Sequence, residues 1–459
     1  MNHGLRDKRA KVRVMRAGRM ARAAGPAGLA GRAAWRWAGT QFAWGKRRTL
    51  SHDRFLLRTA EDVTRTMGDM KGAVMKVGQV MSMMTGAMPD QLTGPLAGLQ
   101  ANAPPMAFNL VEDVFRGDFG ASPGEVFRRF EREPFAAASI GQVHRARLAD
   151  GTPVAVKVQY PGVREAIEHD LANIGLLMGV AGVAAPRLDL AAMLRELKDG
   201  ILAELDYPRE AAWQRRFGEL YEGHAFVRVP RVYERMTTGR VLVQEYLAGR
   251  PFRAALELPQ EQRNRVAEMV FRFSFGNFYR HSLFQGDPHA GNYLLLPDGA
   301  VGFVDYGCVA EFPRETVLRF EELIRALLDH DLEAWRAASE RVGIIHAGAP
   351  FSTQELYEHM HWFWAPILEE QVTFTPELAG EMVRRQAQTR GRGGAINRPL
   401  KIPEGMLVLP RIHFGLAGLL ASLHAEGPWQ AIVAEYVRGD APRTELGRLS
   451  AATSRGPSV

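Results

Sequence analysis

The sequence predicts an α+β protein of two lobes preceded by a helical extension, and two features of its patterning carry that prediction. Strand-like apolar runs occur at residues 135–143, 154–158 and 240–249. Helical spacing of apolar residues dominates from residue 260 onward, interrupted by one β-hairpin pattern at residues 293–304. We therefore expect an N-terminal lobe that contains the three strands and a mostly helical C-terminal lobe.

The stretch 284–307, FQGDPHAGNYLLLPDGAVGFVDYG, holds two acidic residues, each in a break beside an apolar run. Asp287 is surrounded by Gly and Pro, which exclude a helix interior and predict a loop. The hairpin that follows brings Asp305 close to Asn292. An Asp, an Asn five residues later and an Asp-aromatic-Gly after a short hairpin is the order of proton acceptor, second metal ligand and first metal ligand in phosphoryl transfer. The alternative is a pair of ordinary turn carboxylates.

Composition narrows the class of protein. The length of 459 residues suggests about three domains, and 46% hydrophobic with 24% charged residues is ordinary for a globular chain. A single cysteine, Cys308, excludes intramolecular disulfides and cysteine-cluster zinc sites and fits a reducing, cytoplasmic location. We expect Cys308 to be a small buried residue rather than a nucleophile.

The basic character of the chain belongs to its N-terminal arm, residues 1–52. Residues 1–50 contain 13 Lys and Arg and one acid, net +12, which leaves 45 basic and 50 acidic residues, net −5, in the other 409. Four aromatic residues near the basic cluster suit peripheral contact with an anionic membrane. The alternative is a solvated, partly disordered tail, and nucleic-acid binding is not expected because no recognised module accompanies the charges. No apolar run reaches 18 residues, so no spanning helix is predicted.

Residues 53–105 form the predicted helical extension. Apolar residues there recur at spacings of three and four, and Gly78 falls on the apolar stripe, where a missing side chain permits close packing. Lys76 and Gln79 flank that contact. The alternative is an ordinary helix in which Gly78 only permits close packing against a neighbouring helix.

Residues 106–249 form the predicted nucleotide-binding lobe. The strand 154–158 carries Lys157 in the manner of the V-A-I-K strand whose lysine reaches the α- and β-phosphates. The preceding run places small residues where a phosphate-binding loop would have glycines, and Ala in place of Gly predicts a stiffer loop. The candidate nucleotide contacts in this run are Ala136, Ala137, Ala138, Ser139, Gly141 and Val143.

Glu204 lies on the inward stripe of an amphipathic helix predicted over residues 189–216, which Pro208 perturbs or ends. A buried carboxylate needs a partner, and Lys157 is the natural candidate; the alternative is a Glu that reaches solvent at the stripe's edge. The run at 240–249 is predicted to be a strand leading into a hinge. In a kinase-like fold, the backbone at Glu245 and Leu247 would pair with adenine. Residues 250–438 form the predicted helical C-lobe, residues 389–394 a mobile loop within it, and residues 439–459 a disordered tail.

Together these residues resemble the AarF/UbiB-type atypical kinase family, over about residues 59–420. The motifs are the KxGQ element at 76–79, the alanine-rich loop at 136–139, the ExD element at 204–206, GDPHAGN at 286–292 and the Asp-Tyr-Gly at 305–307. Ala290 replaces a more usual Pro, and Tyr306 a more frequent Phe. The two C-terminal membrane helices of the quinone-biosynthesis members are not evident.

The resemblance implies a bilobal protein-kinase-like fold that binds ATP or ADP with Mg²⁺ or Mn²⁺ at Asn292 and Asp305. Asp287 would be the proton acceptor, the Lys157–Glu204 pair would position the phosphates, and the extension carrying Lys76 would fold over the site. A lipid or quinone-like molecule is then a more natural partner than a protein substrate. Two alternatives remain open: a small-molecule phosphotransferase of the aminoglycoside or choline kinase type, and a scaffold that binds nucleotide without turnover.

Overall fold

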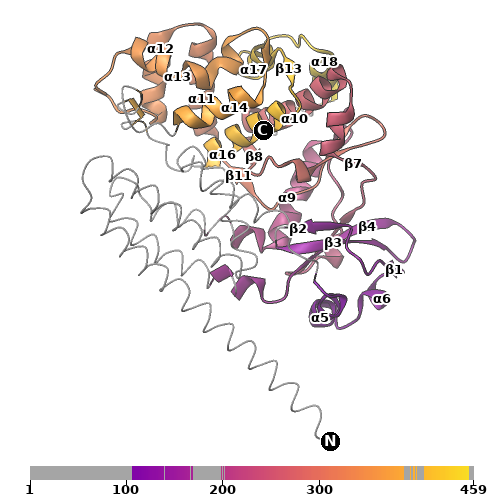
Figure 1. Ribbon diagram of the computed structural model, residues 1–459. Coiled ribbons are helices and arrows are strands. Elements are labelled where there is room, and N and C mark those ends of the chain that lie inside the picture. The colour runs from indigo at the N-terminus through magenta and orange to yellow at the C-terminus, as the bar shows by residue number, and fades with distance from the viewer. Residues whose placement is uncertain are drawn as a thin grey trace, which may run out of the picture. The chain divides into compact units, whose positions relative to one another are not determined.

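A computed structural model of the chain describes residues 106–138, 140–165, 167–168, 198, 200, 202–386, 393, 396–397, 400 and 408–453 (Figure 1). The N-terminal arm, the extension with Lys76, Ser139 and most of the 389–394 loop lie outside the described residues. The chain divides into two compact units. The first comprises residues 1–126, 131–144 and 157–205, and the second comprises 127–130, 145–156 and 206–459.

The first unit begins, among its described residues, with helix α5. Val111, Val114 and Phe115 of α5 are buried, and Gly120 ends the helix in the left-handed conformation, with φ of 68° and its amide bonded to the carbonyl of Arg116. The elements of this part of the chain are α5 (Phe108–Phe119), α6 (Pro123–Val126), β1 (Arg129–Phe130), β2 (Ala136–Ala138), β3 (Gly141–Arg147) and β4 (Pro153–Gln159). Strands β3 and β4 are each divided between the two units, β3 after His144 and β4 after Val156.

The predicted apolar runs of the N-terminal lobe fall in one sheet, but the run 135–143 is divided between the antiparallel strands β2 and β3 and is not a single strand. The order of this sheet is β1-β3-β4-β6, with β2 also paired to β3, and β6 spans Val241–Glu245. All residues of β4 after Pro153 are buried. The turn before β4 has Gly151 at φ of 91°, and the Thr152 amide donates to the Asp150 carboxylate at 2.9 Å, as the Asp-Gly pair predicts.

The second unit contains the hairpin on which the candidate site depends. Strands β9 and β10 pair antiparallel with Phe303 opposite Tyr293, so the predicted hairpin is confirmed. The sheet order is β5-β10-β9-β7, and a separate pair joins β8 to β11. These strands are β5 (Val227–Arg228), β7 (Arg250–Pro251), β8 (Leu283–Gln285), β9 (Tyr293–Leu295), β10 (Val301–Phe303) and β11 (Val309–Glu311).

Helix α10, Gln260–His281, is the centre of the second unit, and twelve of its residues are buried. Phe273 of α10 stacks on Phe303 of the hairpin with 3.7 Å between ring centroids, which ties the hairpin to the helical core. In Figure 1 the orange and yellow helices gather beside α10. The remaining elements are α9 (Tyr207–Leu220), α11 (Arg314–Leu328), α12 (Leu332–Val342), α13 (Thr353–Leu368), α14 (Pro376–Gln386), α16 (Val408–Ser422), α17 (Trp429–Val437), α18 (Glu445–Thr453), the β12–β13 pair (Val372–Thr373, Glu426–Gly427) and short 3-10 turns at Glu234–Met236, Phe252–Glu257 and Ala290–Asn292.

The structure also corrects predictions for three other parts of the chain. The helix predicted over residues 189–216 is not continuous: the helical residues 202–204 end in a turn at Leu205, and α9 begins at Tyr207, with the Asp206 side chain accepting from the amide of Arg209. Pro208 lies in the first turn of α9, where its missing amide hydrogen would have no partner within the helix. Residues 445–453 of the predicted 439–459 tail form α18, which buries Leu446, so this part of the segment is not disordered. Cys308 is half-buried, not buried.

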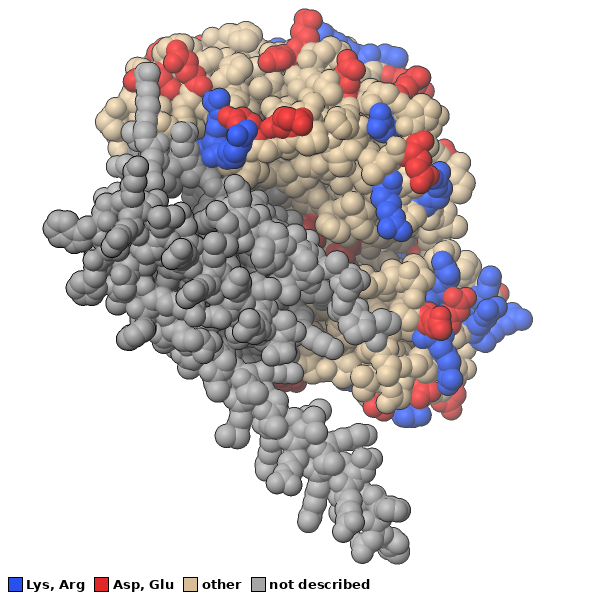
Figure 2. Space-filling model, in the orientation of Figure 1, with Lys and Arg blue, Asp and Glu red and all other residues tan. Residues whose placement is uncertain are grey.

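The surface of the described part is mixed in charge. On the face drawn in Figure 2, its basic and acidic side chains are interspersed. No helix in the described part of the chain is both long enough and apolar enough to cross a bilayer.

Candidate active site

The loop after β8 presents Asp287 by fixing its backbone. The carbonyl of Asp287 accepts the amide of His289 at 2.8 Å and the side-chain amide of Asn292 at 2.9 Å. The 3-10 turn Ala290–Asn292 then leads into β9, and His289 Nδ1 accepts from the amide of Gly291. Asp287 is half-buried. Burial raises the pKa of the Tyr293 hydroxyl, and the nearby Asp287 carboxylate raises it further, so this phenol stays protonated beside the loop.

Asp305 follows β10 and is held next to Asn292 by the hairpin. The Val304 amide donates to the carbonyl of Asn292 at 3.1 Å. The side chain of Gln285 donates to the backbone carbonyl of Asp305, and Asp305 Oδ1 accepts the amide of Gly307 at 3.0 Å. The structure thus brings Asp287, Asn292 and Asp305 together within the second unit, as the hairpin pattern predicted.

The side chains at Asn292 and Asp305 fit a hard divalent cation. The Asn292 amide nitrogen is used in the bond to the Asp287 carbonyl, which leaves its side-chain oxygen as the ligating atom. An amide oxygen and a carboxylate are ligands that Mg²⁺ and Mn²⁺ accept. Within the described part of the chain no group of three His, Cys, Asp or Glu forms a ready metal cage. Nucleotide-linked Mg²⁺ needs none, because phosphates and water complete its shell.

The Asp-Tyr-Gly motif that carries Asp305 packs on apolar side chains. Tyr306 of the Asp-Tyr-Gly motif is fully buried, 5.0 Å from the Phe217 ring, and its hydroxyl has no hydrogen-bond partner among the described residues. Burial raises the pKa of Tyr306 well above its usual value, and Tyr221 and Asp305 add to that effect. The motif therefore anchors Asp305 through its aromatic residue.

Sequence reasoning missed one residue that shapes this loop. A Cβ on Gly415 of α16 would lie 2.7 Å from Cγ of Pro288, the residue after Asp287. Glycine is needed because helix and loop approach more closely than any side chain allows. Nothing in the local sequence signals this contact, since glycine also occurs in apolar helices that touch no loop.

We expect Gly415→Ala to displace Pro288, lowering turnover and destabilising the fold by about 1–3 kcal/mol through overpacking. Gly418, one turn along α16, is the matched control: nothing lies within 4 Å of a Cβ placed there. Gly418→Ala is expected to stabilise the helix by up to about 1 kcal/mol. Chemical denaturation of both variants, with an activity assay, checks this. Equal stability and activity in the two variants would refute the role of the Gly415 contact.

Lys157 and Glu204 lie in the first unit and are both buried, at 9% and 8% exposure. Gln159, two residues after Lys157 on β4, donates from its side chain to the carbonyl of Leu205 at 2.9 Å. Residues two apart share a face of a strand, so the face of β4 that carries Lys157 contacts the chain immediately after Glu204. The two side chains are therefore brought to the same region, and neither is without interactions.

If Lys157 and Glu204 pair, changing both should cost less than the sum of the single changes. We expect Lys157→Met and Glu204→Gln each to lower stability, with a coupling of about 0.5–3 kcal/mol in the double variant. Exposed Glu165 in the same unit supplies the control, and Lys157→Met with Glu165→Gln should be additive. A double-mutant cycle on the free energy of unfolding measures the coupling. If the effects of Lys157→Met and Glu204→Gln on the free energy of unfolding add strictly, the two side chains do not interact.

The alanine-rich run is a tight hairpin in the first unit. Ala136 pairs with Val143 and Ala138 with Gly141 across β2 and β3. A Cβ on Gly141 would lie 2.2 Å from the carbonyl oxygen of Val158, so glycine at this position is required by packing on β4. Ala137 pairs with Gln142 between them.

The hinge residues belong to the second unit. Glu245 at the end of β6 is exposed, donates its amide to the carbonyl of Arg231 at 2.8 Å and accepts the Arg231 amide on its side chain. Leu247 packs on the hairpin, 2.9 Å from where a Cβ on Gly302 would lie. The candidate residues are thus divided between two sets, each within one unit.

The sheet, the catalytic-type loop and the Asp-Tyr-Gly after a hairpin define a kinase-like fold. The chain belongs to the ABC1 atypical kinase-like domain family, whose model matches residues 98–339. This confirms the AarF/UbiB resemblance and the fold class that it implies. Folds of this class use ATP and divalent metal ions.

The chain is similar to several known proteins, and two of those given below carry AarF-domain or atypical-kinase names. It is 31% identical to an uncharacterized Synechocystis protein over 66% of this chain and 78% of that one. It is 32% identical to AarF domain-containing protein kinase 1 of Xenopus laevis and 30% identical to the mitochondrial atypical kinase coq-8 of Caenorhabditis elegans, over 60% and 62% of this chain. The chain spans only 54% and 39% of the length of those two relatives.

A solved structure supports the fold. The chain matches Rv3197 of Mycobacterium tuberculosis, solved in complex with erythromycin, with a TM-score of 0.62 and 31% identity. The match covers 85% of this chain and 98% of that one.

Proposed function

We propose that the chain is an ATP-dependent enzyme that performs metal-assisted phosphoryl transfer or slow ATP hydrolysis. The observation that carries this proposal is the clustering of Asp287, Asn292 and Asp305 in the second unit, with Asn292 bonded to the backbone of Asp287. Asp287 then accepts the proton of the attacking hydroxyl or water. Asn292 and Asp305 hold Mg²⁺ or Mn²⁺, which when bound neutralises phosphate charge.

Lys157, oriented by Glu204, would contact the α- and β-phosphates, while the backbone at Glu245 and Leu247 would receive adenine. The run Ala136–Ala138, with Ser139, Gly141 and Val143, would cover the phosphates. Lys76 would reach the site from the extension. A scaffold without turnover is less favoured, because binding alone needs no proton acceptor at Asp287.

We further propose that the acceptor is a lipid or quinone-like molecule rather than a protein. The support is the resemblance to a family linked to quinone and lipid homeostasis, whose extension folds where a kinase would hold a peptide. The basic residues 1–50, net +12, suit contact with an anionic membrane that holds such molecules.

The experiment is to incubate the full chain and Mg²⁺ with ATP labelled at the γ-phosphate, with and without a lipid and quinone extract. We expect label in inorganic phosphate, and in an extractable product when the acceptor is present. Label that stays in ATP under both conditions would contradict enzymatic turnover and favour the scaffold.

A further inference from the structure

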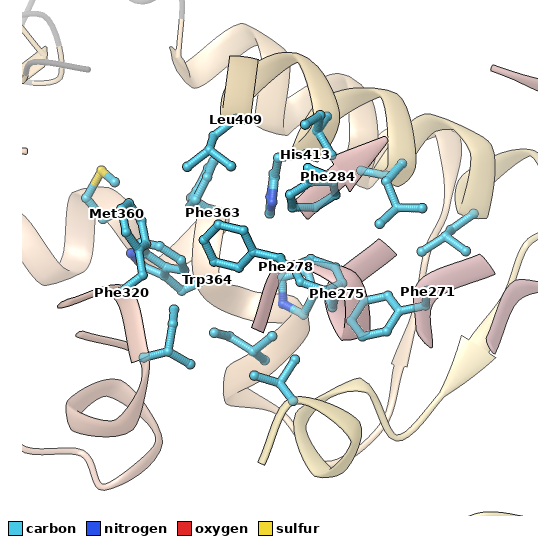
Figure 3. Close-up of a pocket in the computed structure, with 18 of the residues that line it drawn as sticks. Phe271, Phe275, Phe278, Phe284, Phe320, Met360, Phe363, Trp364, Leu409 and His413 are labelled. Carbon is cyan, nitrogen blue, oxygen red and sulfur yellow. The ribbon is translucent and has the colours of Figure 1, made fainter. Parts of the chain in front are cut away.

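Gln285 is the last residue of β8 and lies two residues before Asp287. Its neighbour in the strand, Phe284, lines an apolar cavity (Figure 3), and the centroid of its ring lies 5.5 Å from that of Phe278 of α10. Because successive side chains of a strand lie on opposite faces, the Gln285 side chain leaves β8 on the face away from that cavity. The aromatic packing of Phe284 therefore holds in place the strand from which Gln285 extends.

The Gln285 side chain reaches the segment that carries Asp305. Its Nε2 donates to the backbone carbonyl of Asp305, and Gln285 is only 5% exposed. A carbonyl can only accept, so the nitrogen of the side-chain amide is the atom that faces it. The bond joins the strand that leads into Asp287, the proposed proton acceptor, to Asp305, the proposed metal ligand.

A backbone bond holds the other end of the same segment. The amide of Gly286 donates to the carbonyl of Cys308 at 2.5 Å, beside the antiparallel pairing of β8 with β11. Residues 305–308 are therefore held at both ends by two consecutive residues, Gln285 and Gly286. The backbone bond fixes the end at Cys308, and the end at Asp305 depends on the Gln285 side chain.

The orientation of the Asp305 carboxylate follows from that of its backbone. Asp305 Oδ1 accepts the amide of Gly307 at 3.0 Å, which limits rotation of the carboxylate. The Gly307 amide lies two residues along the chain, so its direction depends on how the peptide group after Asp305 is turned. By holding the carbonyl of that peptide group, Gln285 also holds the amide that orients the carboxylate.

We propose that Gln285 is a positioning residue for the metal ligand Asp305, an inference that rests on the proposed metal-dependent function. Gln285 keeps the Asp305 carboxylate directed at the cation and at a fixed place relative to Asp287. Removing a hydrogen bond that supports a metal ligand commonly lowers metal affinity or activity by about 10–100-fold. A neutral amide suits this role, because a cationic donor would repel the divalent cation.

Gln285→Met keeps the length of the side chain and removes its donor. Equilibrium binding of a non-hydrolysable ATP analogue to the full chain, with excess Mg²⁺ and with chelator, measures the effect without turnover. We expect the affinity with Mg²⁺ to fall about ten-fold, and the affinity with chelator to change by less than about two-fold. An equal fall under both conditions, or no fall under either, would overturn the proposal.

Gln285→His restores a donor, because the imidazole Nε2–H extends about as far from the backbone as the side-chain amide of glutamine. Its affinity with Mg²⁺ should lie within about three-fold of wild type, since the support of the metal ligand is kept. A histidine variant as weak as Gln285→Met would show that the donated hydrogen bond is not the cause and would overturn the assignment. If Gln285→Met does not fold, Gln285→Asn takes its place, because its amide is one methylene too short to reach Asp305.

Gln214 of α9 supplies the matched control. It is fully buried and, like Gln285, donates from its side chain to a backbone carbonyl, that of Pro230 at 2.6 Å. Gln214→Met should lower stability, as the loss of a buried hydrogen bond does, but leave the affinity with Mg²⁺ within about two-fold of wild type. A fall as large as that in Gln285→Met would mean that the loss of any buried glutamine has this effect, and would overturn the proposal.

Failure of this inference differs from failure of the proposed function. Wild type that binds the analogue equally well with Mg²⁺ and with chelator would contradict the metal site, and the positioning role with it. A preference for Mg²⁺ in wild type that Gln285→Met fully retains would overturn the positioning role alone.

Discussion

Asp287→Asn is expected to lower the rate of ATP turnover by about 10²–10⁴-fold, while Mg·ATP binding persists. The amide has nearly the shape of the carboxylate but cannot accept the proton. The backbone clamp on the Asp287 carbonyl, made by His289 and Asn292, does not involve the altered atoms, so the loop should keep its conformation. Phosphate release under saturating ATP measures turnover, and thermal stabilisation by Mg·ATP measures binding.

Asp298 is the control for this substitution. It is an exposed acid in the hairpin turn, paired with Arg228 at 2.9 Å. Asp298→Asn should leave turnover unchanged within a factor of about two, since exposed pairs contribute little. If the Asp287→Asn variant turns over ATP at the wild-type rate, Asp287 is not the proton acceptor.

Arg272→Met should produce the largest loss of stability, about 3–5 kcal/mol. Arg272 of α10 is almost fully buried and pairs with Glu435 of α17 at 2.6 Å and with Glu268 at 2.7 Å. It also donates to Thr444 at 2.8 Å, just before α18. Without the guanidinium, two largely buried carboxylates lose their counterion. Denaturant unfolding gives the change in the free energy of unfolding.

Adding Glu435→Gln to Arg272→Met should recover part of the loss, because one unpaired charge is removed. The exposed pair Arg319–Glu315 on α11 is the control, and Arg319→Met should cost less than about 1 kcal/mol. A loss below about 1 kcal/mol for Arg272→Met would mean that the network does not hold α10, α17 and the segment before α18 together.

Local patterns predicted that Asp287, Asn292 and Asp305 lie close together. A loop rich in Gly and Pro, two apolar runs and a four-residue turn determine the hairpin, and the hairpin determines that Asp305 lies beside Asn292. These contacts join residues close in the chain, so periodicity and turn chemistry suffice. The strand that carries Lys157 was also predictable, because the run 154–158 is rich in β-branched residues and follows an Asp-Gly turn.

Contacts between residues far apart in the chain could not be predicted in this way. The polar composition after residue 439 suggested disorder, yet Arg272, more than 160 residues earlier, bonds Thr444, and α18 buries Leu446. The Gly415–Pro288 contact likewise depends on how α16 packs on the loop that carries Asp287, about 130 residues earlier. A single sequence does not encode such packing in any local signal.

The most direct test of the central claim is the thermal stabilisation of wild type and Asp305→Asn by ATP, with and without Mg²⁺. If Asp305 holds the cation that bridges the phosphates, wild type should be stabilised by Mg·ATP far more than by ATP with chelator. Asp305→Asn should lose that metal-dependent increment while keeping the same stability without nucleotide. Equal stabilisation of Asp305→Asn and wild type by Mg·ATP would contradict the assignment of this loop and hairpin as a metal-dependent nucleotide site.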